Sequence, residues 1–327
     1  MKQRIHYVDV AKGILISLVV LGHISAYSLG DHSRLFYFIY SFHMPCWFFF
    51  SGFFYKAKQS NLYFSSKLKT LLLPYLIFSI FNMFIEGFAI SIDKEKIYAL
   101  FRFGGLWFLI TLFSISVIYY VLENACFRNL DRNKRTILLS VVSLLFLIVG
   151  LTVGGGNVGT HDTKTCIFVN FFFFHVGACL GDVKEGFSTN KPVKRCFLGI
   201  IGFLILITLF YIAPLNPSPV DVNINRYGNK LMFVAFAIIG IAGMLLLSSG
   251  IQENGVIEYL GRYSLVILLS HFPIWRVANY ICAYYQICSY TRLILVFIVT
   301  MSTSLVAVHI INKYIPELKG EFRYSNG

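Results

Sequence analysis

The sequence is short of charged residues. Asp, Glu, Lys and Arg make up 13% of the 327 residues, whereas 57% are hydrophobic and the mean hydropathy is +0.70. Ordinary soluble domains carry about 25% charged residues, so the composition excludes that class and indicates a polytopic membrane protein. No polar segment approaches the roughly 50 residues that a separate soluble domain needs. We therefore expect residues 1–327 to form a single integral-membrane domain.

Motifs that mark several other protein classes are also missing. The seven cysteines include no Cys-x-x-Cys pair, and there is no His-Glu-x-x-His sequence. We therefore expect no disulfide framework, no metal site and no permanently bound cofactor. The net charge of +13 is spread between apolar runs instead of forming one patch, which argues against a nucleic-acid partner. No Ala-x-Ala cleavage site follows the basic start of the chain, so the first apolar run should be a retained helix.

The sequence contains ten apolar runs, each long enough to cross a bilayer. We place them at 8–29, 35–55, 70–90, 106–122, 136–153, 165–181, 197–214, 230–250, 258–281 and 292–313. The expected fold class is all-α, a polytopic bundle of about ten transmembrane helices in the lipid bilayer. Of the 28 Lys and Arg residues, 18 fall in segments on one side and 9 on the other. The positive-inside rule then predicts that both termini are cytoplasmic.

The first two runs carry polar residues that are costly in hydrocarbon, namely Asp9, Lys12, His23 and His43. Lys12 and His23 are eleven residues apart, which places them within about 20° of one helix face and about 16 Å apart along the axis. His43 should lie at a depth similar to that of His23, and we expect His271 of the ninth run to approach the same level. Ionisable residues inside a membrane are functional candidates by default.

Short motifs run through nearly the whole chain. Asp9-x-x-Lys12-Gly13 and Gly22-His23 are followed by Ser41-Phe42-His43-Met44-Pro45 and Phe50-Ser51-Gly52. Further motifs are LLLPYLIF (71–78), LWFL (106–109), FFFFHVGACLGD (171–182) and LGRYSLVILLSHFP (260–273). Together they resemble the acyltransferase 3 family, and most closely its fucose O-acetylase-like branch. One position departs from that pattern: the family frequently has Arg where this chain has Lys12, which keeps the charge but lacks the bidentate fork.

The resemblance implies an integral-membrane enzyme that transfers an acyl group, usually acetyl, from acyl-CoA to a carbohydrate hydroxyl. The expected co-substrate is cytoplasmic acetyl-CoA, the acceptor is an O-antigen, capsule or exopolysaccharide unit or its lipid-linked precursor, and the location is the cytoplasmic membrane. His23 is the candidate general base or transient acyl acceptor, because a neutral imidazole can take the proton of a hydroxyl. His43 is the second catalytic candidate, and Lys12 the candidate for binding the acyl donor.

Four further residues are accessory candidates. Asp9 lies one turn before Lys12, so it either pairs with that lysine or has a separate role. Glu86 in the third run could orient a histidine or contact sugar, or extend to the membrane interface. Trp107 begins the fourth run, where an indole serves either as an interface anchor or as a platform for a sugar face. His271-Phe272-Pro273 repeats the His-x-Pro sequence that begins at His43.

These residues leave three other interpretations open. The histidines could simply hydrogen-bond between helices. The two His-x-Pro motifs, on helices expected to run in opposite directions, also fit a proton-coupled transporter of a small polar solute or lipid-linked sugar built from inverted repeats. A Zn(II) site of His23, His43 and His271 has no local motif to support it.

Overall fold

A computed structural model describes residues 5–56, 60–87, 106–154, 162–188, 191–252 and 254–314. Within these ranges the chain is helical, and its only extended pairing is an isolated bridge between Asp221 and Arg226. Eight helices of the described chain are long and apolar enough to cross a membrane. The expected all-α membrane bundle is therefore confirmed.

The long helices coincide with the apolar runs. They are α1 (His6–Ser28), α2 (Arg34–Phe53), α6 (Trp107–Val121), α7 (Arg132–Gly154), α8 (Thr163–Leu180), α9 (Pro192–Ile212), α10 (Lys230–Ile251), α12 (Ser264–Tyr284) and α13 (Ser289–Tyr314). The third run corresponds to a π-helical turn (Leu68–Leu72) followed by α4 (Leu73–Gly87). A further helix, α3 (Ser60–Lys67), precedes them. A short helix, α11 (Gly255–Arg262), precedes α12.

Two details differ from the expected spans. The run 258–281 is not one helix, because the chain turns at Tyr263 (φ −104°, ψ 16°) between α11 and α12. The helices α2 and α4 are outside the set of eight. α4 has 15 residues, too few to span the bilayer alone, and α2 includes Arg34, His43 and Pro45 among its 20 residues. Both still pack as parts of the bundle.

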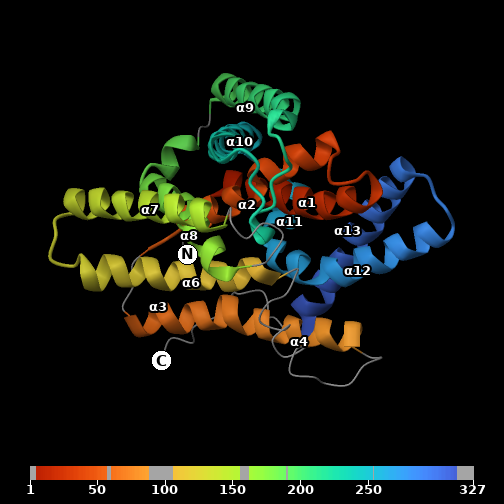
Figure 1. The fold of residues 1–327 in the computed structure, drawn as a ribbon, viewed down its shortest axis with the longest axis horizontal. Helices are drawn as coiled ribbons and strands as arrows, with labels where there is room; N and C mark the ends of the chain where they lie inside the picture. The colour runs from red at the N-terminus through yellow and green to blue at the C-terminus, as the bar shows by residue number, and fades with distance from the viewer. Residues whose placement is uncertain are drawn as a thin grey trace.

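The first two helices occupy the middle of the molecule. In Figure 1, α1 and α2 lie between α9 and α10 on one side and α6 with α3 and α4 on the other. α2 packs against α8 and α10, and α1 packs against α11, α13, α10 and α12. The outer helices α7, α9 and α13 expose apolar side chains such as Leu145, Phe203 and Ile298, which suits a lipid-facing surface.

Glycines allow the central helices to pack closely against their neighbours. A Cβ on Gly52 would collide with the carbonyl oxygen of Phe174, and one on Gly177 would collide with that of Phe49. α2 and α8 therefore touch backbone to backbone, as small residues allow in membrane bundles. Gly13 of α1 contacts the Ile257 carbonyl of α11 in the same way. These contacts fix the helices that carry the polar residues.

Candidate functional site

His23 lies in the last third of α1 and faces α2. The preceding residue, Gly22, makes room for that neighbour, since a Cβ there would lie 3.1 Å from the ring of Tyr40. The Tyr40 hydroxyl is 3.4 Å from Nδ1 of His23. The Gly22-His23 pair thus brings a phenol from the second helix onto the imidazole of the first.

The two His-x-Pro motifs have the same local geometry. Nδ1 of His43 is 2.8 Å from the carbonyl oxygen of Ile39, and Nδ1 of His271 is 2.8 Å from that of Leu268. A carbonyl only accepts, so Nδ1 carries the proton in both rings, and the neutral imidazole has its lone pair on Nε2. Nε2 of His271 is buried and has no hydrogen-bond partner within the described residues. Both helices continue through their prolines.

α12 runs parallel to α1 beside His23. The ring centroids of His23 and His271 are 5.5 Å apart, and one turn further along the two helices those of Tyr27 and Trp275 are 4.8 Å apart. The Trp275 ring is parallel to the His23 ring, with an interplanar angle of 2° and 6.4 Å between centroids. His43 joins the group through Tyr40, with 4.7 Å between their rings. The structure therefore brings the three histidines together, as their matched depths predict.

The three imidazoles differ in accessibility. His43 is 4% exposed and His271 is fully buried, whereas His23 keeps part of its surface open. Of these histidines, His23 is the one that is not fully enclosed by its neighbours. In the described part of the chain, no three of the His, Cys, Asp and Glu side chains form a group that could hold a metal ion.

Lys12 lies toward the opposite end of α1 from Tyr27. Its Nζ is 5.1 Å from the ring centroid of Phe54, the residue that follows α2. Along α1, eleven residues separate Lys12 from His23, or about 16 Å. The cation and the imidazole therefore occupy two depths of the bundle.

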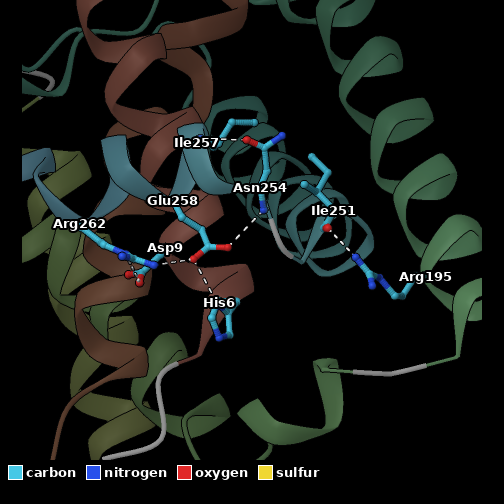
Figure 2. A network of polar contacts seen from close by, with 8 residues as sticks. All are labelled: His6, Asp9, Arg195, Ile251, Asn254, Ile257, Glu258 and Arg262. Atoms are coloured by element: carbon cyan, nitrogen blue, oxygen red, sulfur yellow. Dashed lines mark hydrogen bonds and ion pairs between the residues drawn. The ribbon is translucent and has the colours of Figure 1, made fainter. Parts of the chain in front are cut away.

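A network of charged residues joins the start of α1 to α11, and Figure 2 shows its members. The Arg262 guanidinium donates to Glu258 at 2.9 Å and lies 3.9 Å from the carboxylate of Asp9. Nδ1 of His6 is 3.0 Å from the same Glu258 carboxylate. Burial by itself raises the pKa of Glu258, but the hydrogen bonds from His6 and Arg262 outweigh it, and the pKa lies below its ordinary value. Asp9 thus has an arginine beside it as well as Lys12 one turn away.

Trp107 and Glu86 are two of the accessory candidates. Trp107 begins α6, as expected, but its indole is 9% exposed and packs beside Phe48, so it is not an exposed interface anchor. Glu86 belongs to α4, and its side chain lies outside the part of the chain that the structure describes.

Sequence reasoning missed the partners of the histidines. Tyr40 is one of 20 tyrosines and Trp275 one of three tryptophans, and residue type alone does not show which of them contacts an imidazole. A signal existed in their spacing, because Trp275 follows His271 by four residues and Tyr27 follows His23 by four, which puts each pair on one helix face. Glu258 and Arg262 were likewise recognisable as an i,i+4 ion pair.

A family profile described as an acyltransferase domain matches residues 5–311, which include the helices described above except the last three residues of α13. No curated protein and no solved structure matches the chain.

Proposed function

This chain belongs to the acyltransferase 3 family, and from that premise we propose that it transfers an acetyl group from acetyl-CoA to a carbohydrate hydroxyl. The acceptor in this proposal is a surface or exported polysaccharide, or its lipid-linked precursor, at the cytoplasmic membrane. The family and the apolar helices make the protein a multi-pass membrane acyltransferase. The observation that carries the finer proposal is His23, a partly buried imidazole set among Tyr40, His271 and Trp275.

In the proposed reaction His23 acts as general base. If its Nδ1–H donates to the Tyr40 oxygen, the lone pair is on Nε2, which takes the proton of the acceptor hydroxyl. The hydroxyl oxygen attacks the thioester carbonyl, the bond to the CoA sulfur breaks, and the thiolate receives the proton from His23. A positioned base of this kind contributes about 10² to 10⁴ in rate. His43 packs on Tyr40 and helps to hold it against His23.

Lys12 is the proposed contact for the donor. CoA has its phosphates at the end remote from the thioester, so a cation about three turns from the base along α1 suits its length. A lysine ammonium binds phosphate as a point charge. The transporter interpretation uses the same histidines, but the family match supports acyl transfer.

The test is mass spectrometry of surface glycan from cells with the wild-type protein, without it, and with His23→Ala. We expect glycan from cells without the protein, and from cells with His23→Ala, to lack the added mass of the acetyl group. His309→Ala replaces a histidine of α13 outside this group and should leave acetylation intact. Unchanged acetylation in cells whose membranes contain folded His23→Ala protein would remove His23 from the reaction.

A further inference from the structure

Two aromatic rings, those of Tyr27 and Trp275, lie between the protein surface and His23 at the end of the bundle opposite Lys12. Tyr27 is 60% exposed, whereas Trp275, 4.8 Å away between centroids, is 2% exposed. Trp275 in turn lies parallel to the His23 ring. A ligand with an apolar face that packs on Tyr27 would therefore sit one helical turn from the candidate base.

Two buried donors at this end lack an acceptor. Within the described residues, neither Nε1 of Trp275 nor Nε of Arg226 has a hydrogen-bond partner. Buried polar groups are almost always paired, and leaving one unpaired is unfavourable. A ligand that inserts beside them would supply the oxygen acceptors that both N–H groups lack.

Contacts with Asp31 and Asp221 hold Arg226 in place. Its guanidinium donates to Asp31, in the connection between α1 and α2, at 2.8 Å, and its backbone pairs with Asp221. The hydrogen bond from Arg226 holds the pKa of Asp31 below its ordinary value. Asp31 is three residues beyond Ser28, the last residue of α1, so the Arg226 guanidinium is fixed beside the end of α1 that carries Tyr27.

We propose that the carbohydrate acceptor binds here, with a sugar face on Tyr27 and sugar oxygens accepting hydrogen bonds from Trp275 and Arg226. The inference rests on the proposed function, and it assigns the acceptor to the end of α1 opposite the donor contact at Lys12. Aromatic rings suit the apolar faces of sugars, and a few fixed polar groups give orientation. The basic-residue distribution predicts that this end faces outward, the side on which surface polysaccharide is found.

The experiment uses the full-length protein in proteoliposomes, with acetyl-CoA and the organism's own polysaccharide after mild alkaline deacetylation. Tyr27→Leu should raise the KM for polysaccharide about two- to tenfold through loss of aromatic packing and leave the KM for acetyl-CoA unchanged. Tyr211→Leu is the matched control, because Tyr211 is 62% exposed and lies on α9. Arg226→Gln should also raise the KM for polysaccharide, and by more than Asp31→Asn, which breaks the same ion pair but keeps the guanidinium.

A second measurement separates this inference from the proposed function. Tryptophan fluorescence titrated with polysaccharide alone reports binding without turnover, and Tyr27→Leu should weaken it. Binding that depends on Tyr27 without any release of CoA would overturn the proposed reaction and leave the acceptor site standing. Equal effects of Tyr27→Leu and Tyr211→Leu, or a defect confined to the KM for acetyl-CoA, would overturn the acceptor site.

Discussion

Lys12→Ala should weaken the apparent affinity for acyl-CoA and leave that for the acceptor nearly unchanged. Removing one charge-assisted contact costs about 1.5 to 3 kcal/mol, which corresponds to roughly ten- to a hundredfold in binding. Lys12→Arg keeps the charge and should retain substantial function, since phosphate accepts from either cation. The two variants together separate a requirement for charge from a requirement for lysine.

The competing explanation is that Lys12 only neutralises Asp9. In that case Asp9→Asn combined with Lys12→Ala would recover what the single substitution loses. The structure argues against such recovery, because Arg262 also lies 3.9 Å from the Asp9 carboxylate. Phe54→Leu is the control for the ring contact of Lys12, whose contribution should be only about 0.5 to 1 kcal/mol at an exposed site.

The assay is the initial rate of CoA release in proteoliposomes, with acyl-CoA and acceptor titrated separately for each variant. Our reasoning requires a raised KM for acyl-CoA in Lys12→Ala that persists in the double variant. Recovery in the double variant, or a defect seen only with the acceptor, would refute it.

Three further predictions follow from particular contacts. Tyr40→Phe removes the hydroxyl at 3.4 Å from His23 and should lower kcat about two- to tenfold, the worth of one neutral hydrogen bond, with both KM values kept. Gly52→Ala places a methyl group against the Phe174 carbonyl and should lower the melting temperature, whereas Gly255→Ala meets nothing within 4 Å and should not. For topology, a maleimide that cannot cross the membrane should label single-cysteine protein at exposed Cys288 from outside but not at exposed Cys126.

Each of these has a result that would contradict it. An unchanged kcat in Tyr40→Phe would mean that His23 needs no partner on α2. Equal melting temperatures for the two glycine variants would refute the close contact of α2 with α8. Labelling of Cys126 from outside would reverse the orientation, and with it the side from which the donor enters. Cys288 is a suitable probe because hydrogen bonding to Thr291 lowers the pKa of its thiol.

The sequence predicted the helices well because an apolar run of spanning length has few alternatives to a helix. It also predicted that His23, His43 and His271 would lie at similar depths, since polar groups in apolar runs are conspicuous and their depths could be counted. It did not predict the turn at Tyr263, because apolar residues before it, such as Leu260, extend the apolar run that follows, although Arg262 interrupts them. The predicted run therefore begins at Glu258, whereas in the structure this residue belongs to a network at the start of α1.

Partners across helices were the part that sequence could not supply. Nothing in the residue types says which of many aromatic side chains contacts an imidazole, because that depends on how the helices are rotated against one another. The rotation is fixed by contacts such as the one between Gly22 and Tyr40, which are visible only in three dimensions.

The most direct test of the central claim is acyl transfer by purified protein in proteoliposomes that contain labelled acetyl-CoA and deacetylated polysaccharide. We predict one free CoA for each acetyl group that appears on the polysaccharide, no release without the acceptor, and loss of both signals in His23→Ala but not in His309→Ala. Movement of polysaccharide or of a small solute across the membrane without consumption of acetyl-CoA would contradict the account and favour a transporter.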